Sequence, residues 1–182
     1  MASQIVRIEP LSSEKASFLK ELMYLALFVP PGSDPLPLSI LEQPQIERYY
    51  KHWGGKGDLG VLAWKHRELV GGAWCRLFDD KDPGYGFVNH ETPELVVAVH
   101  SQYRNAGIGT RLLESLLHIA SRKGFKRLSL SVQKLNPAIR LYKRMGFSTH
   151  WQDEDTCTLI TNLLTYSHDS ANPGTANRPD KL

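Results

Sequence analysis

The sequence predicts an α/β fold in which helices cover both faces of a central β-sheet. Strand-like and helical segments alternate in the second half of the chain. The segment ELVVAV at 94–99 is almost wholly apolar, which is typical of a strand covered on both faces. Residues 109–123 carry their leucines on one helical face, which indicates a helix packed on that sheet.

The chain length and composition favour one globular domain. The chain has 182 residues, of which 41% are hydrophobic and 23% charged, so it can bury one substantial core. We expect a single domain over residues 1–166. The last segment, SHDSANPGTANRPDKL, has almost nothing to bury, so residues 167–182 are expected to form a flexible C-terminal tail.

The charge, hydropathy and cysteine content exclude several classes of partner. A formal net charge of +3 is too small to argue for nucleic acid. No apolar window is long enough to span a membrane, and MASQIVRIEPLSSEK has no secretory pattern. The two cysteines, Cys75 and Cys157, each fall in an expected strand without metal-ligand spacing. These features predict a cytoplasmic protein with reduced thiols, no metal site and no membrane partner.

The first half of the chain is expected to form a strand, two helices and a hairpin. Residues 4–9 alternate apolar and polar side chains, which is typical of a strand. Ser12 or Ser13 could cap a helix running to about Phe28. VPPGSDPLPLS, residues 29–39, is a proline-rich loop suited to covering a site. A helix is expected at 44–52, and four polar residues join strands 59–64 and 69–78 into a hairpin.

The second half is expected to read β-α-β-α-β. Strand 94–99 precedes the helix at 109–123, which Gly124 ends. Strand 127–132 precedes a helix in which Asn136 is a good N-cap, Pro137 a good first residue and Gly146 a stop. TCTLITNLL at 156–164 is the expected last strand.

A glycine-paired turn lies between the apolar strand and the leucine-rich helix. Gly107 and Gly109 let a backbone approach a ligand closely, and the amides from about Ala106 to Thr110 would be free donors at a helix N-terminus. Such a turn suits a phosphate. A dinucleotide fingerprint would need glycine where Leu112 stands, and no Gly-Lys-Ser/Thr triplet is present. A plain tight turn explains the two glycines equally well.

The residues of this turn resemble a family signature. Arg104-Asn105-Ala106-Gly107-Ile108-Gly109 fits the Gln/Arg-x-x-Gly-x-Gly/Ala pattern of the GNAT superfamily of N-acetyltransferases. Leu95–Val99 resembles the central strand of that family, and Asn136-x-Ala-x-x-Leu-Tyr-x-x-x-Gly-Phe resembles a later segment. The resemblance runs from about residue 5 to 164. It implies the acyl-CoA N-acyltransferase fold, whose central sheet is mixed but mostly antiparallel, with helices on both faces.

The resemblance also implies acetyl-CoA as cosubstrate. Main-chain groups of Val97 and Val99 would bind the pantetheine, and Asn136 would contact the same arm, although its role as N-cap needs no ligand. Arg104 would shape the turn. The diphosphate would lie on the turn formed by Arg104, Asn105, Ala106, Gly107, Ile108, Gly109 and Thr110.

Two residues are candidates for catalysis by that resemblance. Tyr142 matches the expected acid that assists the departing thiolate, although it could simply pack in the core. Glu94 begins the central strand and is the candidate base, although it could be a surface charge at a strand end. His100 is the second choice for the base.

The implied reaction transfers acetyl from acetyl-CoA to a primary amine of a small molecule or peptide, by direct attack in a ternary complex. The expected acceptor site lies beneath the proline-rich loop and the acidic 79–91 segment. That segment and its surroundings would suit a cationic amine with some apolar body; they contribute Asp79, Asp80, Asp82, Tyr85, Phe87, His90, Glu91 and Glu94. The three aspartates are equally explained as a solvated acidic loop. Tyr24, Tyr49, Tyr50 and Trp53 could form a wall or belong to the core. A protein N-terminal or lysine acetyltransferase and a noncatalytic acetyl-CoA sensor remain alternatives. Many family members form homodimers, so self-association is also an expectation.

Overall fold

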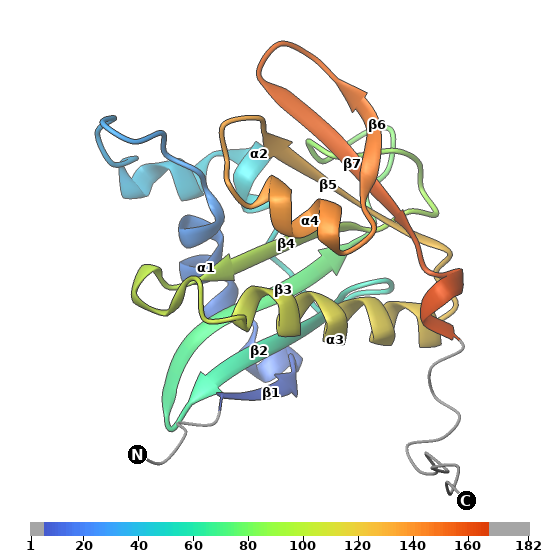
Figure 1. Ribbon diagram of the computed structural model, residues 1–182, viewed down its shortest axis with the longest axis horizontal. Helices are drawn as coiled ribbons and strands as arrows, with labels where there is room; N and C mark the ends of the chain where they lie inside the picture. The colour runs from blue at the N-terminus through green and yellow to red at the C-terminus, as the bar shows by residue number, and fades with distance from the viewer. Residues whose placement is uncertain (1–5, 168–182) are drawn as a thin grey trace, which may run out of the picture.

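The computed structural model describes residues 6–167, which form one seven-stranded sheet with helices on both faces (Figure 1). The strand order is β1-β2-β3-β4-β5-β7-β6. Neighbouring strands are antiparallel except β4 and β5, which are parallel. This arrangement confirms the predicted α/β fold with a mixed, mostly antiparallel sheet.

The bounds of the elements follow the expected order. The strands are β1 (Val6–Pro10), β2 (Leu59–Lys65), β3 (Glu68–Arg76), β4 (Glu94–Val99), β5 (Arg127–Gln133), β6 (Ser148–Gln152) and β7 (Thr156–Asn162). The α-helices are α1 (Phe18–Ala26), α2 (Pro44–Glu47), α3 (Ile108–Arg122) and α4 (Ile139–Arg144). Short 3₁₀ turns are η1 (Ser13–Lys15), η2 (Leu38–Glu42), η3 (Ser101–Tyr103) and η4 (Leu164–Ser167).

Two apolar clusters hold the helices on opposite faces of the sheet. On one face, the leucines of α3 (Leu112, Leu113, Leu116 and Leu117) are fully buried against the sheet. On the other face, Leu19 and Leu22 of α1 pack with Trp74 of β3. Because fully burying a leucine contributes about 1.5–3 kcal/mol, both clusters contribute substantially to the stability of the fold.

Several local expectations differ from the structure. The first α-helix begins at Phe18, because Ser12 and Ser13 lead into a 3₁₀ turn and Ser12 makes no side-chain capping bond. The second helix is regular only over Pro44–Glu47 and continues as turns. Strand β6 was not expected, because all five of its residues are exposed and show no alternation.

The elements expected at the two chain ends fall partly outside the described residues. The expected first strand started at Gln4, whereas β1 is described from Val6. The expected tail, apart from Ser167, lies outside the described residues, so the predicted boundary of the domain at 166 stays a prediction. Both cysteines are buried and unpaired as thiols, as expected.

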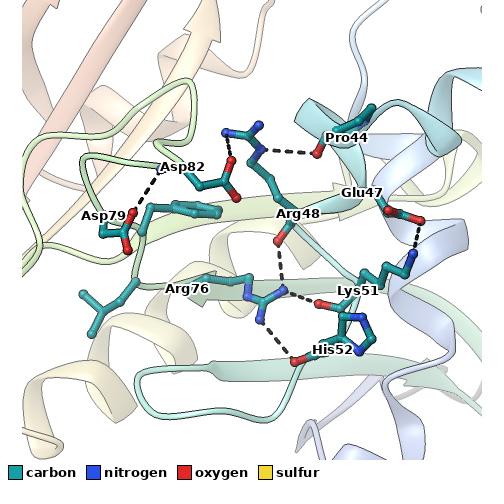
Figure 2. A pocket seen from close by; sticks show the side chains of 10 residues that line it. Pro44, Glu47, Arg48, Lys51, His52, Arg76, Asp79 and Asp82 are labelled. Atoms are coloured by element: carbon teal, nitrogen blue, oxygen red, sulfur yellow. Dashed lines mark hydrogen bonds and ion pairs between the residues drawn. The ribbon is translucent and has the colours of Figure 1, made fainter.

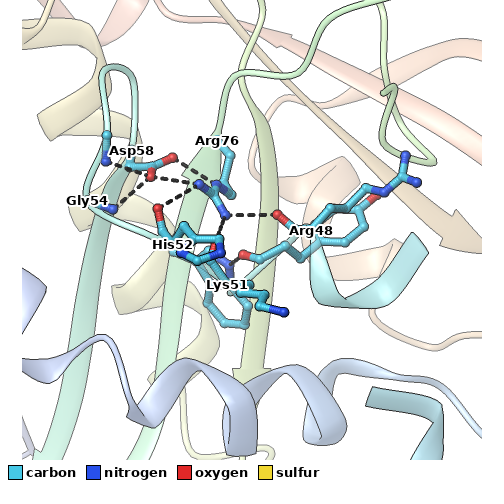
Figure 3. A network of polar contacts seen from close by, with 9 residues as sticks. Arg48, Lys51, His52, Gly54, Asp58 and Arg76 are labelled. Atoms are coloured by element: carbon cyan, nitrogen blue, oxygen red, sulfur yellow. Dashed lines mark hydrogen bonds and ion pairs between the residues drawn. The ribbon is translucent and has the colours of Figure 1, made fainter. Parts of the chain in front are cut away.

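A network around Arg76 connects β3 to the segment after α2 (Figure 3). The Arg76 guanidinium donates to both carboxylate oxygens of Asp58, at 3.0 and 3.1 Å. It also donates to the carbonyl oxygens of Arg48, Lys51 and His52. Asp58 in turn accepts from the main-chain N–H groups of Gly54 and Gly55. The network therefore fixes the position of α2 on this face of the sheet.

Candidate active site

The central feature of the site is the divergence of β4 from β5 (Figure 1). These strands pair only at Glu94 and Ser129, where the Ser129 N–H donates to the Pro93 carbonyl at 3.0 Å. On the other side of β4, the His100 N–H donates to Val70. Since main-chain groups alternate in direction along a strand, those of Val97 and Val99 point away from β3 into the opening.

The turn after β4 presents free main-chain donors. Asn105 and Gly107 have φ of 61° and 75°, in the left-handed region. Arg104 stays within the turn, because its N–H donates to Ser101 and its Nε donates to the Val99 carbonyl at 3.0 Å. The first helical hydrogen bond runs from the Arg111 N–H to Gly107. Among the described residues, the N–H groups of 105–110 have no main-chain acceptor, so the start of the 15-residue α3 can receive an anion.

Gly109 allows α3 and α4 to approach each other. A Cβ atom at Gly109 would lie 3.2 Å from Cδ2 of Leu141 and 3.9 Å from Cγ2 of Val99. The first of these distances is tighter than ordinary contact. A side chain at this position would therefore require the Leu141 side chain to shift slightly, so Gly109 favours close packing of α4 against the turn.

Helix α4 presents Tyr142 and the preceding Asn136 to the opening. Tyr142 is 8% exposed and packs edge-on against Phe147. Burial raises the pKa of Tyr142 to about 12, so its hydroxyl stays protonated at neutral pH. No described residue hydrogen bonds to that hydroxyl. Asn136 Oδ1 accepts from the Ala138 N–H at 2.9 Å, although α4 itself begins at Ile139, so the expected capping role is filled slightly before the helix.

These groups surround one cavity of about 1120 Å³. Its size slightly exceeds the roughly 300–1,000 Å³ of common ligand pockets, which leaves room for two substrates. The cavity is lined by residues 24–33, 35–36, 97–99, 103–105, 107, 109–110, 135–138, 140–142 and 144. It therefore brings together most of the sequence-predicted residues, namely Val97, Val99, Arg104, Asn105, Gly107, Gly109, Thr110, Asn136 and Tyr142. Ala106 and Ile108 belong to the turn but do not line the cavity.

Sequence reasoning missed two arginines of this cavity. Arg140 and Arg144 lie one helical turn apart on α4 and line the cavity. Neither side chain has an ion pair or a hydrogen bond within the described residues. The signal was present in the sequence, because RLYKR repeats a cation after four residues without a neighbouring acid.

Glu94 lies outside this cavity. Its side chain is 3% exposed, and Oε1 accepts from the Tyr49 hydroxyl at 2.7 Å. Oε2 is buried without a hydrogen bond from the described residues, and a Cβ at Gly84 would be only 2.1 Å from it. Burial raises the pKa of Glu94 to about 7, against the opposing effects of the Tyr49 hydroxyl, the Gly86 amide and Arg48. Glu94 is thus a buried acid covered by the β3–β4 loop, rather than a surface charge.

Of the other residues expected near the acceptor, some line the large cavity and others lie outside it. Of the two expected segments, the proline-rich loop lines the cavity, whereas residues 79–91 do not. Among the aromatic candidates, Tyr24 lines it, and its hydroxyl donates to the Leu36 carbonyl at 2.5 Å. Tyr49 belongs to the apolar core. His100 lies outside the cavity, with Nε2 3.3 Å from Oε1 of Glu21.

A second hollow, of about 510 Å³, lies between α2 and the start of the β3–β4 loop (Figure 2). It is lined by charged residues that pair with one another. Arg48 Nη1 lies 2.8 Å from Asp82 Oδ1 and donates to the Pro83 carbonyl. Lys51 pairs with Glu47 at 2.8 Å. Asp79 Oδ1 accepts from the main chain at Lys81 and Asp82. The charged groups here hold neighbouring segments together.

Comparison with known proteins assigns the family. The profile of the Acetyltransferase (GNAT) family matches residues 26–147, so the chain belongs to the GNAT acetyltransferases. PaiA N-acetyltransferase from Thermoplasma acidophilum, whose structure was solved with coenzyme A, has a similar fold with a TM-score of 0.60 at 18% identity. That similarity covers 87% of this chain and 99% of the other.

Two curated relatives are similar in sequence over part of the chain. The chain is 29% identical to the probable N-acetyltransferase san of Drosophila melanogaster and to N-alpha-acetyltransferase 50 of Danio rerio, over 103 residues in each case. These alignments cover 56% of this chain, and 53% and 58% of the relatives. The chain thus spans just over half the length of the relatives it matches.

The described residues contain neither a membrane-spanning helix nor a cluster of metal ligands. Within residues 6–167, no helix is long and apolar enough to cross a membrane. The same described part contains no group of three or more histidine, cysteine or acidic side chains arranged to bind a metal ion.

Proposed function

We propose that this chain is an N-acetyltransferase that transfers the acetyl group of acetyl-CoA to a primary amine of a small molecule or peptide. The observation that carries the proposal is the continuity of the large cavity. It runs from the N–H groups of 105–110, past the main-chain groups of Val97 and Val99 that point away from β3, to the hydroxyl of Tyr142, which has no partner among the described residues. A phosphate, an amide-bearing arm and a thioester need these groups in this order.

Each part of acetyl-CoA has a proposed partner in the cavity. The main-chain donors of the turn would bind the diphosphate, with Arg140 and Arg144 adding positive charge. The amide groups of the pantetheine would pair with Val97 and Val99, much as an added strand does. Asn136 uses Oδ1 in its turn and keeps its NH₂ group available as a donor to the same arm.

The bound cosubstrate supplies a thioester: the amine nitrogen bonds to its carbonyl carbon, the C–S bond breaks, and the electron pair leaves on sulfur. Tyr142 would donate a hydrogen bond to that sulfur. Because its pKa is about 12 and that of a thiol is about 8.5, Tyr142 stabilises the thiolate without giving up its proton fully.

The proton released by the amine needs an acceptor, because an alkyl amine near pKa 10.4 is almost wholly protonated at neutral pH. Glu94 is the proposed base, since a pKa near 7 suits this task. Its burial outside the cavity means that the proton would have to reach it through water or Tyr49. If the pH dependence of kcat/KM is the same for the wild type and Glu94→Gln, water accepts the proton instead.

Protein N-terminal acetylation is the second candidate function. Its support is the similarity to a relative named N-alpha-acetyltransferase 50. Release of free thiol from acetyl-CoA, measured with a panel of amines, amino acids and peptides, tests both functions. Turnover of small amines or amino acids supports the first proposal, and turnover restricted to the N-termini or lysines of protein-derived peptides supports the second. Binding of acetyl-CoA without transfer to any acceptor would instead indicate a sensor.

A further inference from the structure

The cavity has a second wall, to which none of the proposed contacts with acetyl-CoA is assigned. This apolar wall, residues 24–31, runs from the end of α1 into the proline-rich loop and lines the cavity throughout. Residues 24–30 are all half-buried, and apart from Tyr24 they are apolar: Leu25, Ala26, Leu27, Phe28, Val29 and Pro30. Half-buried apolar side chains that line a cavity favour an apolar ligand.

The apolar wall is held in place before any ligand binds. The Tyr24 hydroxyl donates to the Leu36 carbonyl, which ties the beginning of the wall to the far side of the loop. The Ser33 N–H donates to the Pro30 carbonyl at 3.1 Å and closes a turn between them. Since the neighbouring prolines also restrict the backbone, the wall loses little conformational freedom when a ligand binds.

The charges of the cavity are all of one sign. Its described lining includes Arg104, Arg140 and Arg144 but no aspartate or glutamate. The acid in the loop itself, Asp34, does not line the cavity. Asp82, from the segment expected to receive a cationic acceptor, pairs with Arg48 in the other hollow. A second ammonium group in the acceptor would therefore be desolvated without a protein counter-ion.

We infer that the acceptor is a monoamine whose body next to the reacting nitrogen is apolar, and that polyamines and other polycations are poor substrates. This inference rests on the proposed function and narrows its acceptor class. The apolar wall binds the body of the acceptor, and Arg140 and Arg144 are left for the phosphates of acetyl-CoA.

A matched pair of acceptors tests the inference. Hexylamine and 1,6-diaminohexane have the same carbon chain, and only the second carries another ammonium group. We expect kcat/KM for hexylamine to exceed that for the diamine by about tenfold or more. A diamine that is turned over as well as hexylamine, or better, overturns the inference while leaving the proposed acetyl transfer intact.

Binding provides a measurement that does not depend on turnover. Calorimetric titration of each amine into protein saturated with coenzyme A should give the same order of affinity, and failure of hexylamine to bind better contradicts the inference. Ser33→Asp places an acid on the exposed part of the lining and should reduce the preference for hexylamine, whereas Ser33→Ala should keep it. Loss of acetyl-CoA binding itself would count against the proposed function.

Discussion

The two hollows of this protein both contain arginines, but they use them differently. In the smaller hollow, Arg76 binds Asp58 and three main-chain carbonyls, and Arg48 binds Asp82. In the larger cavity, Arg140 and Arg144 have no protein partner among the described residues. A paired charge fixes the chain that surrounds it, whereas an unpaired charge lining a cavity remains available to a ligand. The same residue type therefore indicates architecture in one place and binding in the other.

The largest expected effect is a loss of stability when the Arg76–Asp58 pair at the smaller hollow is broken. Arg76→Ala leaves Asp58, whose side chain is only 4% exposed, without its cation. Removing one partner of a buried pair typically costs about 3–5 kcal/mol, so we expect a loss of that size in the free energy of unfolding. Chemical denaturation measures it. Arg140→Ala is the control and should change stability by about 0.5 kcal/mol or less; equal losses in both variants would contradict the comparison.

The second effect concerns Glu94, which lies beside the smaller hollow. Its pKa is about 7 in the folded protein against 4.5 for an ordinary glutamate, so the folded state binds the proton more tightly than the unfolded state. Stability should therefore fall as pH rises from about 4.5 to 7, by up to about 3 kcal/mol. Glu94→Gln should lack this fall. Chemical denaturation of the wild type and Glu94→Gln at pH 5 and pH 8 measures this change in the free energy of unfolding. An identical pH dependence in the two proteins would contradict the raised pKa of Glu94.

The third effect falls on the larger cavity and on catalysis. Tyr142→Phe removes the proposed hydrogen bond to the departing sulfur, and we expect kcat to fall by about tenfold to several hundredfold while acetyl-CoA still binds. Tyr50→Phe is the matched control, because the Tyr50 hydroxyl donates to the Leu41 carbonyl outside the cavity. Steady-state kinetics of both variants measure the change in kcat. Unchanged turnover in Tyr142→Phe would remove this residue from the mechanism.

The smallest effect sharpens the comparison between paired and unpaired arginines. Arg140→Ala and Arg144→Ala should each weaken acetyl-CoA binding by about three- to tenfold, because each removes an exposed cation facing phosphate. Lys143 lies on the same helix but does not line the cavity. The Lys143→Ala variant should therefore bind acetyl-CoA with an affinity near that of the wild type. Calorimetry at low and high salt measures these affinities. An equal loss of acetyl-CoA affinity at positions 140 and 143 would show that the affinity depends only on the net charge of the protein and not on which cation lines the cavity.

Local patterns in the sequence predicted the parts of the site that are built locally. The glycine turn at 104–110 and the segment from Asn136 to Phe147 each follow from consecutive residues, because caps, stops and helix starts depend on near neighbours. The expected main-chain roles of Val97 and Val99 came instead from the family resemblance, because the sequence of a strand does not show which neighbour each main-chain group faces. These residues line one cavity, although their contacts with acetyl-CoA stay predictions.

The parts that depend on distant segments could not be predicted. The choice between a base and a surface charge at Glu94 stayed open, because nothing near it in sequence reveals that Tyr49 and Gly84 cover it. The pairing of Arg76 with Asp58 joins residues that give no periodic signal. Strand β6 was missed because an exposed edge strand need not alternate apolar and polar residues.

Hydrogen exchange with and without acetyl-CoA tests the central claim most directly. We predict that acetyl-CoA slows exchange of the main-chain amides at 97, 99 and 105–110, which have no main-chain acceptor within residues 6–167. The amides at 76–82, beside the smaller hollow, should exchange at unchanged rates. Protection of 76–82 without protection of 105–110, or no protection in either segment, would contradict the claim that the opening between β4 and β5 binds the acetyl donor.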